Sequence, residues 1–584
     1  MSGTEFSALG HFRIGLNPSL LKEARGRTPG PERTSSHAWR YACLILATIL
    51  PAVPMAATAQ TALAVSDEEG NPLGEVALRP VPCSTPASEL LRVGLALLHN
   101  MTYEGARARF TEAVVTDPDC LLGYWGAAMS YIHPLWPDRP TDEDLAAGSR
   151  ILATANSRRA PTAFEAALLG AVHEYYRDAP ERTEAQRLEA FRVGWEEAAR
   201  RFPGDPEIRL FHALSLLVAA QGSADMMELH ERAGEMAQEV LRMVPRHPGA
   251  LHYTIHAFDL PELAERGEPA ARAYGEVIPE NAHALHMTSH IFTRLGAWEE
   301  SVAYNGRATE ASLRPPLDGL SLPNFFHAAD YLVYALLQRG ESASARALHD
   351  QLRELEGDLP QPLHPAAAYT LAAVPARLAL ERQAWVEASR LAPRPSVSIP
   401  WDRFPHLEAI PTFAAGLGAA RSGDVDAAEA ALTQLSRLRE RAAEVADPFD
   451  WGTQVRIQEL ALEAWILFEG GDSQEGLQRM REAAYLEEGN EKHGVSPGNV
   501  LPAAELYGDM QMEVGQHAEA LIAYENALER SPNRLNSLYG AGRAAEALGD
   551  TDTARTYYRR LMRQASESAD FDRVRHAADF LRDG

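Results

Sequence analysis

Apolar residues recur with the period of an α-helix from about residue 85 to the end of the chain. Alanine-rich segments, with apolar residues at every third or fourth position, alternate with short turns that contain Gly, Pro or Asp. This pattern is typical of helices that each bury one apolar face against their neighbours. A half-buried strand would alternate apolar and polar residues, and no stretch of useful length does so. We therefore predict an all-α protein, without a sheet, over residues 85–584.

A longer period, of about 34 residues, groups the predicted helices into repeats. Small residues, one aromatic residue and a proline recur near the C-terminus, at Gly508, Gly515, Ala520, Tyr524, Ala527 and Pro532. The set returns one repeat length later at Gly542, Gly549, Ala554 and Tyr558, and a related set stands at Gly94, Ala106, Phe110, Ala113 and Pro118. Small residues allow two helices to approach closely, the aromatic ring fills the space between them, and the proline closes the unit.

These spacings resemble those of the tetratricopeptide repeat (TPR) family. The resemblance implies a right-handed superhelical solenoid, in this chain of about twelve helix pairs, in which the first helix of each pair lines a concave groove. A peptide, a protein or a small-molecule ligand would bind in that groove. The stretches HPGALHYTIHAFD and HALHMTSHIFTRLG also resemble a group of exported bacterial repeat proteins. That second resemblance implies a fold and no particular chemistry.

Two His-x-x-x-His pairs lie in the middle of the chain, His252 with His256 and His286 with His290. Equivalent members of the two pairs are separated by the length of one repeat. Residues four apart share one face of a helix, and neighbouring helices pack roughly 8–10 Å apart. We therefore predict that the four imidazoles converge from two adjacent helices into one site.

Five further polar residues share the helical faces of these histidines: His283, His327, Asp330, Asp259 and Tyr334. His283 and Asp259 each lie three residues from a paired histidine. The other three repeat the same spacing on the next predicted helix. The TPR resemblance places all of them on the concave surface. They are expected to surround a metal ion or to contact a ligand.

Neutral imidazole is a common ligand for zinc and copper, and helical histidines four residues apart can share one ion. Neither pair has glutamate directly after its first histidine, which argues against a familiar zinc metallopeptidase. Two functions therefore fit the sequence. The first is a transition-metal site for copper or zinc in the groove, which includes a metalloenzyme that acts on a peptide or small molecule. The second is a metal-free scaffold for a peptide or protein, in which the histidines form hydrogen bonds.

Another candidate groove surface lies nearer the N-terminus. His99 and His133 are also separated by one repeat length, and Trp136 follows closely. These residues either extend the groove toward the central histidines or are packed at helix ends with their hydrogen bonds satisfied.

A charged stretch in the C-terminal half, residues 486–509, provides the last candidates. It contains Glu491 and Lys492 and runs into a predicted helix with Glu505 and Asp509. Because Glu505 and Asp509 are four residues apart, they share a helical face and could clamp a peptide terminus. The alternative is a solvated loop followed by ordinary helix charges.

The composition is that of a globular protein, with 46% hydrophobic and 23% charged residues. Its net charge of −26 opposes binding to nucleic acid and to anionic lipid, and it tolerates a cationic ligand or a metal ion. Cys83 and Cys120 follow the N-terminal region. They could form a disulfide in an oxidising compartment, remain two buried thiols, or place one thiol near a metal.

The N-terminus resembles a signal for export. Basic residues precede an apolar run at residues 41–55, and Ala57-Thr58-Ala59 matches a cleavage site with small residues. The run is too short and too rich in proline to span a membrane, and an uncleaved anchor is the alternative. We expect an exported protein, periplasmic in a Gram-negative bacterium, without a stable membrane span after cleavage.

The chain is accordingly divided into five predicted segments. They are a signal at 1–59, a linker at 60–86, N-terminal repeats at 87–247, central His-rich repeats at 248–350, and C-terminal repeats at 351–584. The central segment carries the predicted metal site. The two flanking segments carry the other groove candidates.

Overall fold

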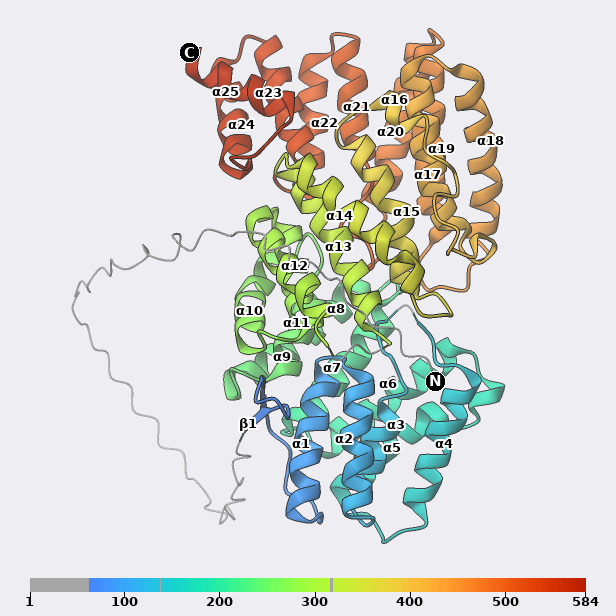
Figure 1. Cartoon of the computed structure of the whole chain (residues 1–584), viewed down its shortest axis with the longest axis vertical. Coiled ribbons are helices and arrows are strands. Elements are labelled where there is room, and N and C mark those ends of the chain that lie inside the picture. Colours follow the sequence, from blue (N-terminus) through green and yellow to red (C-terminus); the bar gives the residue numbers. More distant parts are fainter. Residues whose placement is uncertain (1–61, 137, 316–318, 584) are drawn as a thin grey trace, which may run out of the picture. The chain divides into compact units, whose positions relative to one another are not determined.

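The computed structural model describes residues 62–136, 138–315 and 319–583, in which 25 α-helices follow one another along the chain. Most helices pack against the helix before and the helix after them, as the prediction of an all-α TPR-like solenoid requires (Figure 1). That prediction is confirmed. The predicted signal at residues 1–59 lies outside the described residues. None of the described helices combines the length and the apolar character that crossing a membrane requires.

Grouped by the predicted N-terminal, central and C-terminal repeats, the helices form three sets. The first comprises α1 (Thr85–His99), α2 (Tyr103–Thr116), α3 (Leu121–Met129), α4 (Asp142–Asn156), α5 (Ala163–Tyr176), α6 (Glu184–Arg201), α7 (Pro206–Ala220) and α8 (Met226–Met243). The second comprises α9 (Pro248–Phe258), α10 (Ala264–Val277), α11 (Ala282–Leu295), α12 (Trp298–Ser312), α13 (Ser321–Gln338) and α14 (Ser342–Leu355). The third comprises α15 (Pro365–Leu380), α16 (Trp385–Ala388), α17 (Pro405–Ser422), α18 (Val425–Ala442), α19 (Trp451–Glu469), α20 (Ser473–Glu488), α21 (Ala503–Glu513), α22 (His517–Arg530), α23 (Leu535–Ala547), α24 (Thr551–Gln564) and α25 (Asp572–Asp583).

Aromatic rings separate the helices where the repeat pattern predicts them. A β-carbon added at Gly508 would lie 2.8 Å from the ring of Tyr524, and one at Gly542 would lie 2.4 Å from the ring of Tyr558. Neither ring could keep its place beside a larger residue, because side chains do not approach that closely. The small and aromatic positions of the repeat are therefore packing positions.

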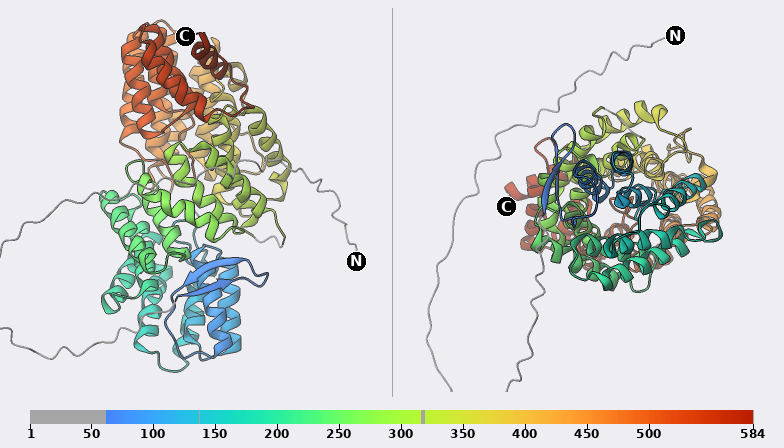
Figure 2. Two further views of the ribbon diagram at one scale, coloured as in Figure 1. Left: turned by 90° about the vertical axis from the view of Figure 1, so that its left-hand side faces the viewer. Right: turned by 90° about the horizontal axis from the view of Figure 1, so that it is seen from below.

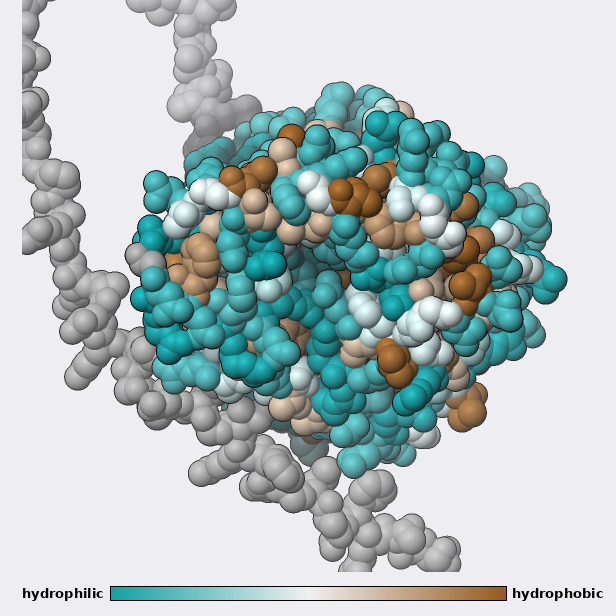
Figure 3. All heavy atoms as spheres, turned by 90° about the horizontal axis from the view of Figure 1, so that it is seen from above, coloured by the Kyte–Doolittle hydropathy of each residue, from teal (hydrophilic) through white to brown (hydrophobic). Residues whose placement is uncertain are grey.

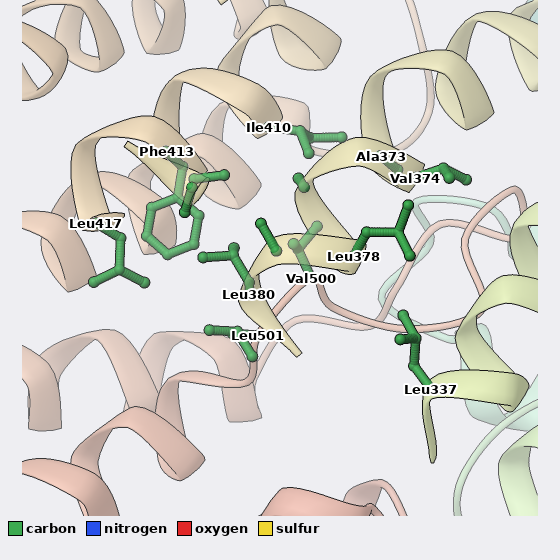
Figure 4. Packing of buried hydrophobic residues seen from close by; sticks show 14 of the residues in the cluster. Leu337, Ala373, Val374, Leu378, Leu380, Ile410, Phe413, Leu417, Val500 and Leu501 are labelled. Carbon is green, nitrogen blue, oxygen red and sulfur yellow. The ribbon is translucent and has the colours of Figure 1, made fainter. Parts of the chain in front are cut away.

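Buried apolar residues form two large clusters. One extends over residues 65–292 and ends on α11, and the other extends over residues 325–577 and begins on α13 (Figure 4 shows part of the second). The predicted central histidines lie on α9, α11 and α13, so they lie where the two clusters meet. Outside, the face drawn in Figure 3 is mostly hydrophilic, with scattered apolar residues and a recess near its middle.

Part of the predicted linker is instead a β-hairpin. Strands β1 (Leu63–Ser66) and β2 (Pro72–Val76) pair in antiparallel fashion and lie against α1 and α9 (Figure 2). The backbone N–H of Glu75 donates to the carbonyl of Arg246 at 3.0 Å. The strands are four and five residues long, too short to show a clear period in the sequence. No strand occurs among the described residues from 85 onward, as predicted.

A disulfide joins Cys83 to Cys120, with an S–S distance of 2.11 Å. Of the three possibilities that the sequence left open, the structure therefore contains the bonded pair. The bond ties the segment before α1 to the residue that precedes α3.

Candidate metal centre

Three histidines from two neighbouring helices form a first triad. Helix α9 supplies His252 and His256, and α11 supplies His283. Nε2 of His252 lies 3.1 Å from Nε2 of His256 and 3.2 Å from Nε2 of His283. One nitrogen from each ring lies within 4.8 Å of the other two, which is close enough for a single ion to be shared.

A second triad lies further along α11. It comprises His286 and His290 from α11 and His327 from α13. The Nε2 atoms of His286 and His290 are 3.0 Å apart, and the ring centroids of His286 and His327 are 4.3 Å apart. Histidines from two neighbouring repeats therefore lie together in this triad.

The sequence predicted one site from the four paired histidines, whereas the structure divides them between two triads. His283 and His327, predicted as supporting residues, are full members of the triads. The reason is that α11 packs between α9 and α13, so its histidines face two partners. His283 and His286 are three residues apart on that helix, which places their β-carbons roughly 5–6 Å apart. The two triads are thus neighbours.

Fixed oxygen acceptors orient three of the six rings. Nδ1 of His252 lies 2.7 Å from the carbonyl oxygen of His99, Nδ1 of His286 lies 2.9 Å from Oδ1 of Asn305, and Nδ1 of His290 lies 2.8 Å from Oδ2 of Asp259. A carbonyl or carboxylate oxygen only accepts, so each Nδ1 carries the proton of a neutral ring. Each Nε2 then presents a lone pair, and this is the arrangement that metal-binding histidines adopt.

In the second triad, the lone pairs on two Nε2 atoms therefore face each other. His286 and His290 both hold their proton at Nδ1, yet their Nε2 atoms are only 3.0 Å apart. Burial lowers the pKa of both rings, so a proton between them is disfavoured at neutral pH. Nδ1 of the third ring, His327, is buried and has no hydrogen-bond partner among the described residues. A metal with bonds of about 2.0–2.1 Å to nitrogen would relieve this contact.

The first triad is also held neutral. Burial lowers the pKa of His252 to about 3, and it lowers the pKa of His256 and His283 well below the usual value. Neutral imidazole is the form that binds a metal ion.

Asp259 links the second triad to a set of buried charges. Its Oδ1 accepts from Nε of Arg294 at 2.7 Å, and its Oδ2 lies 3.7 Å from Nζ of Lys492. Glu491 pairs with Arg294 at 2.8 Å. Burial would raise the pKa of Asp259, but Lys492, Arg294 and His290 together hold it well below the usual value. Asp259 is therefore a carboxylate that fixes the orientation of His290.

The charged stretch of the C-terminal half thus reaches the histidines. The loop between α20 and α21 contains Glu491 and Lys492, and it packs on Tyr331 of α13 as well. The Tyr331 hydroxyl lies 3.1 Å from the carbonyl oxygen of Gly494 and 3.0 Å from that of Ser496. Its ring stacks on His290 with centroids 4.7 Å apart. Sequence reasoning missed Tyr331 and Asn305. It followed the spacing of Asp330 and Tyr334 after His327 and passed over Tyr331, which lies four residues after His327, and Asn305 lies on α12, which carries none of the six histidines.

Four predicted groove residues pack against partners within the chain. Asp330 pairs with Arg377 at 2.9 Å, Tyr334 accepts from Arg534 at 2.9 Å, Glu505 pairs with Arg534 at 3.0 Å, and Asp509 accepts from Tyr524 at 2.7 Å. Asp330 and Glu505 are buried, so the structure does not place them on an open groove. The C-terminal repeats pack against α13 and α15, which no local pattern indicates.

His99 belongs to a third buried group, with Glu207 and His247. Nε2 of His99 lies 2.8 Å from Glu207, and Nε2 of His247 lies 3.1 Å from the same carboxylate. Burial alone would raise the pKa of Glu207, but His247 and His99 hold it well below its usual value. Nδ1 of His99 lies 3.0 Å from the Tyr253 hydroxyl, so both ring nitrogens have partners. This group is therefore a closed hydrogen-bond network of side chains. The backbone carbonyl of His99 orients His252.

The other two N-terminal candidates, His133 and Trp136, have different surroundings. His133 is bonded to Asp138 at 2.7 Å and stacks on Tyr103, so it is satisfied locally. Trp136 lies against His283, with ring centroids 5.3 Å apart. Trp136 therefore borders the first triad.

Comparison with known families matches the tetratricopeptide repeat over residues 535–567, which cover α23 and α24. This segment includes Gly542, Gly549, Ala554 and Tyr558, the positions on which the sequence pattern rests. Comparison with curated proteins found no matching sequence.

Proposed function

Because this chain is a TPR-containing protein with two histidine triads among its repeats, we propose that it binds two transition-metal ions, copper or zinc, one in each triad. The observation that carries the proposal concerns His286 and His290. Each ring holds its proton at Nδ1, and yet the two Nε2 atoms lie only 3.0 Å apart. A donor set made only of imidazole suits copper or zinc, whereas calcium and magnesium prefer oxygen ligands.

The proposed centre has the features of a reactive site. Three imidazole ligands leave a coordination position open on each ion, unlike the four-ligand sites that only stabilise a fold. A bound ion at such a position polarises an oxygen atom or lowers the pKa of a water molecule. Asp259 keeps His290 oriented, and Tyr331 and the loop that carries Lys492 cover one side of the second triad. We infer a metalloenzyme that acts on a peptide or small molecule.

The repeat architecture also supports a coarser function. TPR repeats form scaffolds for the binding of proteins or peptides, and this role does not require a metal. Metal-free, folded protein that still binds a peptide would favour the scaffold alone.

The number of metal ions bound per chain should equal the number of intact triads. Metal-free protein loaded with zinc, or separately with copper, should retain about two ions per chain after excess ion is removed. His256→Ala and His286→Ala should each retain about one, because each removes one ligand of three from a different triad. The double variant should retain none. Elemental analysis measures the ions, and circular dichroism checks that the helix content is kept.

A matched control is His173→Ala, which removes an exposed histidine of α5. It should retain both ions. Wild-type metal content in the double variant would show that the ions bind elsewhere.

Asp259→Asn should weaken metal binding by the second triad about 10–100-fold, which is the usual effect of losing the carboxylate behind a ligating histidine. The substitution keeps the size of the side chain, and Arg294 keeps Glu491 as a partner. Competition with a chelator of known affinity measures the change, which should affect one of the two ions. Asp350→Asn, at an exposed carboxylate of α14, is the control. Equal loss of both ions would contradict separate roles for the triads.

A further inference from the structure

A small cavity lies in the C-terminal half, apart from the triads. It has a volume of about 50 Å³, and its lining comes from α15, α17, α19, α20, the start of α21 and the residues just before it. Much of the wall is apolar, and Figure 4 shows Ile410, Phe413, Val500 and Leu501 from it. This space suffices for roughly three to five non-hydrogen atoms.

Four residues that line the cavity carry buried polar atoms without a hydrogen-bond partner in the described part of the chain. They are Nδ1 of His406, Nε1 of Trp451, Nε2 of Gln454 and Oε1 of Gln458. His406 is 9% exposed and Trp451 is 8% exposed, so bulk water does not satisfy them. Most buried polar groups in proteins are paired, and each one left unpaired is costly. Four such atoms around one cavity are therefore unusual.

The arrangement of these residues is regular. Trp451, Gln454 and Gln458 fall within about a 60° arc of α19, so they present one polar stripe. The ring of His406 packs on that of Trp451 with centroids 4.3 Å apart. Burial lowers the pKa of His406 to about 3, so its ring is neutral.

We propose that this cavity binds a small uncharged molecule, or a small uncharged group of a larger one, that carries a carboxamide or hydroxyl beside an apolar part. The indole N–H of Trp451 and the amide of Gln454 are donors, and Oε1 of Gln458 is an acceptor. A ligand must therefore both accept and donate hydrogen bonds. The cavity lining contains no arginine or lysine that would attract an anion, and its one carboxyl group, that of Glu487, already accepts from the backbone N–H of Ala503 at 2.8 Å.

Acetamide is a suitable probe, because its four non-hydrogen atoms match the available space and it both donates and accepts. Metal-free, full-length protein is titrated while the indole N–H resonance of Trp451 is followed by NMR, assigned by Trp451→Phe. We expect a saturable shift with a Kd on the order of 1–10 mM, since so few atoms give little affinity. Acetate, which has the same size but a negative charge, should bind at least tenfold more weakly. A shift that rises linearly without saturation would show a cavity that holds only water and would overturn the proposal.

The double variant Gln454→Leu, Gln458→Leu keeps the size of both side chains and removes two polar partners. It should weaken acetamide binding at least tenfold. Gln478→Leu, at an exposed position of α20, should bind as the wild type does. Equal binding of acetamide by the double variant, or equal binding of acetate by the wild type, would overturn the proposed ligand class. Because metal-free protein is used, the outcome is independent of the triads.

Discussion

Replacement of Arg534 by methionine is expected to destabilise the protein by about 3–5 kcal/mol, because it leaves two buried carboxylates without their cation. The Arg534 side chain is fully buried, and it lies 2.9 Å from Glu381 and 3.0 Å from Glu505. It also donates to the Tyr334 hydroxyl at 2.9 Å. Tyr334 lies on α13, Glu381 directly follows α15, and Glu505 lies on α21, so one guanidinium joins the C-terminal repeats to the helix that carries His327.

The midpoint of urea denaturation, followed by circular dichroism, measures this effect. Adding Glu381→Gln and Glu505→Gln to the variant should recover part of the loss, because neutral amides do not need a buried cation. Arg582→Met, at an exposed ion pair of α25, should leave the midpoint nearly unchanged. A midpoint equal to that of the wild type in Arg534→Met would show that the buried charges do not hold the repeats together.

The second large effect is expected from the disulfide. The double variant Cys83→Ser, Cys120→Ser should lose about 3–4 kcal/mol of stability, because the bond closes a loop with a sequence separation of 37 residues and so restricts the unfolded chain. The loop contains His99, whose carbonyl orients His252. Loss of the bond should therefore also weaken metal binding by the first triad.

Reduction provides a matched comparison for that variant. Dithiothreitol should lower the denaturation midpoint of the wild type to that of the serine variant and should not change the variant itself. An unchanged midpoint of the wild type after complete reduction would contradict a stabilising role for the bond.

The proposed function depends on contacts that are far apart in the sequence. His290 is held by Asp259, and Asp259 lies close to Lys492, which belongs to a loop in the C-terminal repeats. Helices α9, α11 and α13 supply the histidines of the two triads, and the loop between α20 and α21 packs beside the second triad. A substitution in the loop between α20 and α21 can therefore alter the site without touching a histidine.

The sequence by itself determined the helical class, the length of the repeat and the pairing of His252 with His256 and of His286 with His290. These features follow from local periods: residues four apart share a helical face, and equal places in neighbouring repeats lie side by side. The sequence also placed Asp259 on the helical face of a paired histidine, and it left open whether Trp136 reaches the central histidines. Its prediction of export concerns residues outside the described part of the chain and stays a prediction.

Only the tertiary structure decided how the histidines are grouped. Helix α11 packs between two helices, so its histidines separate into two triads, and no local pattern states which way each ring turns. The tertiary structure alone also decided the contacts of Tyr334 and Glu505. The sequence placed both in an open groove, whereas both contact Arg534. The periods of a repeat fix the contacts between neighbouring helices, whereas contacts between distant repeats depend on how the whole array curves. That curvature is the sum of many small packing angles, so it appears only in the folded chain.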